Sequence, residues 1–175
     1  MKILKKPKFP FTTLQEYNGI VNWLGTDRGK RPFTNPVDTG IVRVTGDTTV
    51  PSRAVGVTVS GQDCGWCTNG TPGRSFTLEL PIHVIPTSYC LSYSGNCCRP
   101  DNWKLSGSLT GNVWDDLKVH ANEQGLDVAS RANWAINTTK EYSRFRLTSS
   151  GSDRGGPTCF CFHVCSFEVY GEVSV

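Results

Sequence analysis

The chain has 175 residues, which is enough for one domain with a hydrophobic core and too few for two ordinary domains. Its 18 Lys and Arg against 15 Asp and Glu give a formal charge of +3, far below that of a typical nucleic-acid-binding surface. No run approaches the roughly 18 apolar residues of a membrane-spanning helix, and the basic start lacks the apolar core of a signal peptide. We therefore expect a cytoplasmic protein with neither a nucleic-acid partner nor membrane insertion.

Residues 1–13 are predicted to form a basic N-terminal tail, and residues 14–175 a single domain. From residue 37 onward, apolar and polar residues alternate with period two, which is typical of strands with one buried face. The predicted strands are 41–45, 54–60, 75–80, 88–94, 103–106, 117–120, 134–136, 144–147 and 163–170. Helix signals are nearly absent, apart from a possible single turn at 12–17. This pattern predicts an all-β, antiparallel sandwich or barrel.

Two tryptophans flank the glycine-containing turn near residue 110, and both are predicted to fill the space between two sheets. They are Trp103 and Trp114. In the later strand, Arg144 and Arg146 should point outward while Phe145 and the following leucine point into the core.

The sequence lacks the common motifs of catalysis. The sequence contains no GxSxG, HExxH or phosphate-binding glycine loop. Asp115 and Asp116 are adjacent in a strand, so their side chains should point to opposite faces, which does not suit acid/base chemistry. His83 falls in an expected turn, and no nucleophile–base pair can be drawn. We predict no enzymatic activity, no catalytic residue and no cofactor.

Cysteine is the one unusual component. The eight residues are Cys64, Cys67, Cys90, Cys97, Cys98, Cys159, Cys161 and Cys165. An even number permits disulfides, but the lack of a secretory signal favours reduced thiols. A zinc site is a third alternative, although the spacing is unlike that of any standard finger.

Three segments, taken in order, carry a family resemblance. They are 18–26 with 35–36 and 40–44, then 76–80 with 84–91 and 102–108, then 142–147 with 166–171. Together they resemble the discoidin-like family, the galactose-binding-like jelly-roll sandwiches that include coagulation-factor C domains. The likeness covers about residues 16–172 and is greatest to the intracellular branch found in HECT-type ubiquitin ligases and BTB-domain proteins.

The resemblance implies a jelly-roll β-sandwich that serves as a non-enzymatic binding module. We expect a small intracellular subunit or adaptor that docks a protein partner in a larger assembly. The alternative is a carbohydrate-binding lectin of the discoidin type. Sugar sites need an exposed aromatic ring beside hydrogen-bonding side chains, which Trp66, Arg74, Arg99 and Asn102 could supply.

If successive strands from residue 75 onward are antiparallel, their connections alternate between two ends of the sandwich. One end receives the short connections 81–87, 109–112 and 138–142. The other receives 61–74, 95–101, 121–132 and 150–161, which are mostly longer and hold every cysteine except Cys90 and Cys165. Long irregular loops grouped together commonly carry binding. We predict that Trp66, Arg74, Arg99 and Arg154 cluster there as the partner-facing surface.

Overall fold

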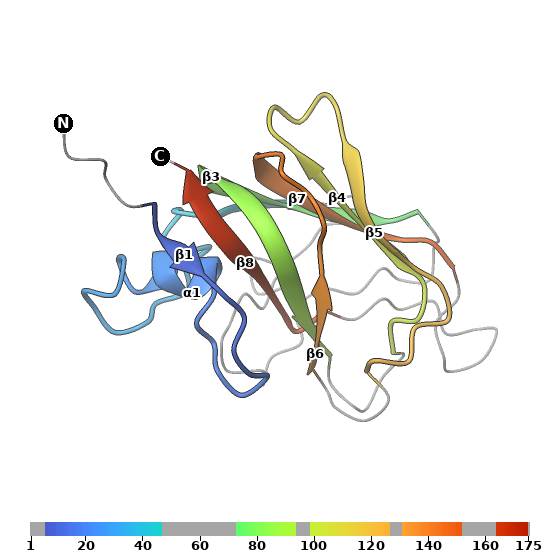
Figure 1. Cartoon of the computed structure of the whole chain (residues 1–175), viewed down its shortest axis with the longest axis horizontal. Coiled ribbons are helices and arrows are strands. Elements are labelled where there is room, and N and C mark those ends of the chain that lie inside the picture. The colour runs from blue at the N-terminus through green and yellow to red at the C-terminus, as the bar shows by residue number, and fades with distance from the viewer. Residues whose placement is uncertain (1–5, 47–72, 94–98, 127–130, 152–163, 175) are drawn as a thin grey trace.

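The computed structural model describes residues 6–46, 73–93, 99–126, 131–151 and 164–174 (Figure 1). Its elements are β1 (Lys8–Phe9), α1 (Ile20–Gly25), β2 (Arg43–Gly46), β3 (Ser75–Ser92), β4 (Trp103–Ser108), β5 (Asp115–His120), β6 (Arg131–Ala135), β7 (Tyr142–Ser149) and β8 (Ser166–Ser174). All pairings between these strands are antiparallel. The predicted antiparallel all-β fold is confirmed. The predicted strand 54–60 lies outside the described residues.

The long strand β3 belongs to both layers of the sandwich. Its first half pairs with β2 and β7, and β7 continues the layer through β4 to β5. Its second half pairs with β6 and β8, and β8 continues to β1. Figure 1 shows β3 bending strongly between these halves.

The core lies between the layers, where the predicted alternation places the large side chains. Phe76 of β3 meets Phe167 of β8 edge to face, with ring centroids 6.2 Å apart. Trp103 is fully buried and contacts Trp134 of β6 at 5.2 Å between centroids. Phe145 is buried as expected, while its neighbours in sequence are half-buried on the outer face.

The expected connection 81–87 is wrong, because these residues lie within β3. Its two prolines suggested a break, since proline cannot donate to a ladder. Pro81 is exposed, and Pro86 sits where the β3–β8 register shifts, so neither needs an N–H in the ladder. The expected turn at His83 is likewise strand. The change of direction expected between 75–80 and 88–94 is still present, as the curvature of β3.

A short helix and the N-terminal segment cover the outer side of β8. The helix, α1, was not expected from the sequence, and among the described residues no helix is long and apolar enough to cross a membrane. Its first turn is bound by the buried carboxylate of Glu168, which accepts the backbone N–H of Val21 at 2.7 Å and of Asn22 at 3.0 Å. A side chain at Gly19 would collide with that carboxylate, so the glycine permits the approach.

Part of the predicted tail also packs on the domain. Lys8 and Phe9 pair with Glu172 and Gly171 of β8. The Phe9 ring lies 5.1 Å from the Trp23 ring of α1. The boundary at residue 13 stays a prediction, but the strand before it is tied to the sandwich.

Candidate functional site

Four segments from separate parts of the chain meet at one end of the sandwich. The backbone N–H of Gly73 donates to the Ser149 carbonyl at 2.8 Å, so the start of β3 adjoins the end of β7. The Asn102 carbonyl accepts the N–H of Ser150 at 3.0 Å, and the Asn102 Oδ1 accepts that of Asn122 at 3.0 Å. We call the described residues 73–74, 99–102, 121–123 and 149–151 the long-loop end.

A buried hydrogen-bond network stands directly beneath the long-loop end. The indole N–H of Trp103 donates to the Tyr89 hydroxyl at 2.9 Å, and that hydroxyl is 2.6 Å from Nε2 of His120. Nδ1 of His120 is 2.5 Å from Oε2 of Glu123. The imidazole also stacks on the Trp103 ring at 4.1 Å between centroids. The network ties both layers to the segment that follows β5.

The electrostatics of this network favour a neutral imidazole. Burial lowers the pKa of His120 and raises the pKa of Tyr89. Burial alone would raise the pKa of Glu123, but the hydrogen bond with His120 leaves it below its usual value. Tyr, His and Glu in a row resemble a proton-transfer chain, yet Tyr89 is 0% exposed and His120 only 4%. Since no substrate could reach these atoms in the folded state, the network supports the fold.

Three of the five predicted binding residues fall on described positions. Arg74 and Asn102 are half-buried where the segments of the long-loop end join. Arg99 is half-buried too, with its Nε 3.5 Å from Oδ1 of the buried Asp101. The structure thus brings Arg74, Arg99 and Asn102 to the same end. Trp66 and Arg154 lie outside the described residues, so their place in this cluster stays a prediction.

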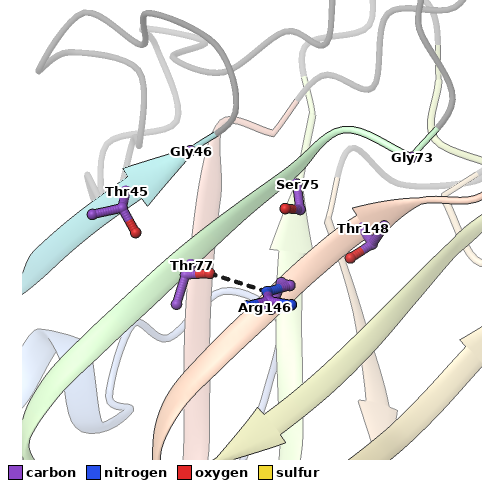
Figure 2. Close-up of a pocket in the computed structure, with 7 residues that line it drawn as sticks. All are labelled: Thr45, Gly46, Gly73, Ser75, Thr77, Arg146 and Thr148. Atoms are coloured by element: carbon purple, nitrogen blue, oxygen red, sulfur yellow. Dashed lines mark hydrogen bonds between the residues drawn. The ribbon is translucent and has the colours of Figure 1, made fainter. Parts of the chain in front are cut away.

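A polar hollow of about 490 Å³ borders the long-loop end. The described residues that line it are Thr45, Gly46, Gly73, Ser75, Thr77, Arg146 and Thr148 (Figure 2). It lies on the outer face of the first layer, where Thr45, Thr77 and Arg146 stand in register across β2, β3 and β7. Sequence reasoning missed it. Its only signal was the run of outward hydroxyl residues in strands whose inward residues are apolar.

The guanidinium of Arg146 is held from two sides. Its Nε donates to Oγ1 of Thr77 at 3.4 Å, and its central carbon lies 3.7 Å from the centroid of the Trp114 ring. Trp114 is therefore half-buried on the outer face, and the prediction that it fills the core is wrong. The indole donates to the Gly111 carbonyl at 2.9 Å, which satisfies its N–H at the surface without a place in the core.

The cysteines show a mixed state in the part of the chain that the structure describes. Cys90 is a free, buried thiol whose pKa is raised by burial. Cys165 is disulfide-bonded, which departs from the reduced state that the sequence favoured. The other six cysteines lie outside the described residues. Among the described residues, no group of three or more His, Cys, Asp or Glu side chains is placed to hold a metal ion.

No family model matches the sequence. The chain is 32% identical over 166 residues to the E3 ubiquitin-protein ligase hecd-1 of Caenorhabditis elegans and 26% identical to the E3 ubiquitin-protein ligase Ufd4 of Drosophila melanogaster. Each match covers 89% of this chain and 6% of the relative. A BTB/POZ domain-containing protein of Arabidopsis thaliana is 25% identical, with 88% of this chain and 21% of the relative covered. The chain thus spans a small fraction of each relative's length.

Solved structures give the same picture of the fold. A CBM32 module from Clostridium perfringens in complex with GalNAc-β-1,3-galactose matches with a TM-score of 0.56 and 16% identity, covering 77% of this chain and 99% of the module. The family 32 carbohydrate-binding module of Streptococcus pneumoniae EndoD matches with a TM-score of 0.53 and 14% identity, covering 75% and 97%. The chain has the discoidin-like fold. The expected jelly-roll sandwich and the expected likeness to ubiquitin ligases and a BTB protein are both confirmed.

Proposed function

We propose that this chain is a non-enzymatic binding module that docks a protein partner through the long-loop end. The observation that carries the proposal is the junction of four chain segments around Asn102, with Arg74 and Arg99 half-buried beside it. Loops supported by a rigid scaffold are the usual place for a binding surface. A guanidinium on such a surface gives both charge and directed hydrogen bonds to a partner.

The relatives support a role within a larger assembly. Two are named as E3 ubiquitin-protein ligases and one as a BTB/POZ domain-containing protein, and the matched region is a small part of each. A domain that recurs as a small part of large proteins suits an adaptor or a subunit that brings partners together. We place the module inside the cell on the same ground, without a cofactor.

The non-enzymatic character rests on the buried network. Tyr89 and His120, the titratable groups of the network beneath the long-loop end, are only 0% and 4% exposed, and His120 is hydrogen-bonded to Glu123. Their hydrogen-bonding groups are satisfied by one another, by the Trp103 indole and, for Glu123, by the backbone N–H groups of Gln124 and Gly125. They hold the scaffold rigid, and a rigid scaffold lowers the entropy cost of binding.

Affinity purification with quantitative mass spectrometry tests the proposal. The tagged chain is expressed in cells of its source as wild type, as Arg74→Ala and as Lys140→Ala. Lys140 lies in the β6–β7 connection at the other end of the sandwich, so its removal is a matched change of charge. We expect Arg74→Ala to reduce recovery of a stoichiometric partner about tenfold and Lys140→Ala to leave it unchanged. Equal recovery with both variants would refute docking through this end.

The alternative function is that of a carbohydrate-binding lectin. The hydroxyl-lined hollow favours it, because hydroxyl groups can exchange hydrogen bonds with a sugar. The described lining holds no aromatic ring, however, and the face of Trp114 nearest the hollow is covered by Arg146. A sugar platform would have to come from Trp66. Binding on a glycan array that is lost in Trp66→Ala would establish the lectin.

A further inference from the structure

Two arginines on β7 share a face of the sheet and differ in their partners. Arg144 Nη2 lies 2.7 Å from Oε1 of Glu79, and its Nη1 donates to the Leu109 carbonyl at 2.8 Å. Among the described residues, Arg146, two residues further, meets the Thr77 hydroxyl and the Trp114 ring. It has no acidic partner among them, and its two terminal amino groups donate no hydrogen bond to them. Within the described residues, the Arg144 guanidinium is neutralised by Glu79, and the Arg146 guanidinium is held in place without an acidic partner.

The described charged groups around Arg146 do not neutralise its guanidinium. Asp116 lies in the same row of the sheet, since Arg146 pairs with Ser106 and Ser106 with Asp116. The Asp116 carboxylate forms an ion pair with Lys104 at 3.0 Å and accepts a hydrogen bond from the Ser106 hydroxyl at 3.1 Å. Glu79 forms an ion pair with Arg144. These two described acids near the hollow, Asp116 and Glu79, therefore already have partners.

The rest of the described lining suits an extended polar ligand. Four hydroxyl side chains, those of Thr45, Ser75, Thr77 and Thr148, can each donate and accept hydrogen bonds. Figure 2 shows them spread along three strands around Arg146, with two glycines near the rim. No acidic side chain is among the described lining residues, so none of these residues would repel an anion.

We propose that the hollow binds a carboxylate side chain of an extended, acidic segment of a protein partner. Arg146 receives the carboxylate through its planar fork, a geometry that a guanidinium matches in a bidentate way. The threonine and serine hydroxyls bond to the backbone of the bound segment. A single guanidinium suits one carboxylate better than a doubly charged phosphate, and the missing aromatic ring argues against a sugar. That the partner is a protein rests on the proposed function, whereas the binding surface, the hollow around Arg146, is distinct from the long-loop end.

Fluorescence anisotropy with the full chain tests the inference. The probe is a fluorescein-labelled hexaglutamate peptide at low salt, and an uncharged glycine–serine peptide of equal length is its reference. We expect saturable binding of hexaglutamate that Arg146→Met weakens at least about tenfold, whereas Arg144→Met changes it less than about threefold. Arg146→Lys keeps the positive charge but not the planar, two-pronged guanidinium, so the loss of affinity for hexaglutamate should be intermediate.

Arg146→Met uncovers the Trp114 ring, so thermal unfolding of each variant accompanies the titration. If Arg146→Met proves unstable, Thr77→Val removes one hydroxyl at constant shape and should weaken binding by about threefold to tenfold. Equal losses in Arg144→Met and Arg146→Met would mean nonspecific charge attraction and would overturn the site.

Other outcomes also decide the question. Tighter Arg146-dependent binding of hexagalacturonate would assign the hollow to acidic sugars, and tighter binding of inorganic phosphate would assign it to phosphate. Either result overturns the peptide assignment. Absence of hexaglutamate binding overturns it too, without bearing on partner recovery by the long-loop end. Conversely, retention of a partner by Arg74→Ala removes the docking proposal and leaves the titration intact.

Discussion

The buried carboxylate of Glu168 gives the fold an unusual pH dependence. Glu168 is 4% exposed, and burial raises its pKa from its ordinary value to about 7, against the lowering effect of the three backbone N–H groups of Val21, Asn22 and Val169. Since the folded chain holds this proton to a higher pH than the unfolded chain, Glu168 favours folding at low pH. That contribution is lost as the pH rises from about 4.5 to about 7.

The magnitude follows from the rise in pKa. An increase from about 4.5 to about 7 corresponds to a loss of about 3 kcal/mol of unfolding free energy across that range. Glu168→Gln removes the titration and keeps nearly the same shape. Its single oxygen can still accept the N–H of Val21 and Val169, while the acceptor for Asn22 is lost. The variant should therefore gain about 3 kcal/mol relative to wild type between pH 4 and pH 8.

The assay is urea unfolding followed by tryptophan fluorescence at a series of pH values. The difference between variant and wild type is the useful quantity, because burial lowers the pKa of His120, which costs stability as pH falls and masks Glu168 in the wild-type curve. Glu172→Gln on the same strand is the control. Lys8 lowers the pKa of Glu172, so its difference curve should slope the opposite way.

A flat difference curve for Glu168→Gln would refute the reasoning. A slope of the opposite sign would show that the three N–H donors and Arg131 outweigh desolvation and that the group is ionised when folded. In that event Glu168 would be an anion bound at the start of α1, and the variant would lose stability as pH rises.

Two further changes test the packing, each by urea unfolding. Trp103→Ala empties the centre of the core and should cost about 3–5 kcal/mol, whereas Val119→Ala, at a side chain 62% exposed, should change little. Gly171→Ala drives a Cβ into the Ile85 carbonyl oxygen at φ +156°, and it should cost at least about 2 kcal/mol. Gly111→Ala also has a positive φ but only ordinary contacts near 3.4 Å, so it should cost about 1 kcal/mol. Similar losses at both glycines would contradict the steric argument.

The strands of the first layer could be predicted because one of their faces is open. In β7, Arg144 and Arg146 alternate with Phe145, and the alternation matches the observed burial. In β8 the same pattern misleads, since nearly every residue of that strand is buried. Because Glu168 alternates with apolar residues, the sequence suggested that its side of β8 faces outward, but α1 and the N-terminal segment cover that side. An alternation of period two predicts that a segment is a strand, but it does not predict which other elements pack on the polar face of that strand.

The site was predictable only in its position. The alternation of connections predicted Arg74 and Arg99 at one end, where the structure places them beside Asn102. The hollow depends on the register of β2, β3 and β7, which single-strand patterns do not contain. Likewise, the register places Glu79 opposite Arg144 and Thr77 opposite Arg146, so that of these two arginines Arg144 has the acidic partner among the described residues.

The two halves of β3 explain where a partner can bind. Along its second half, Ser88 to Ser92 are buried on both faces, because the N-terminal segment packs against the outer side. Arg131 fixes that segment by donating to the Leu14 carbonyl at 2.7 Å and by stacking over the Tyr17 ring at 3.9 Å. Along the first half, the outward residues stay half-buried and line the hollow. The chain thus uses its own N-terminal segment to cover one layer, whereas the polar face of the other layer lines the hollow in the part of the chain that the structure describes.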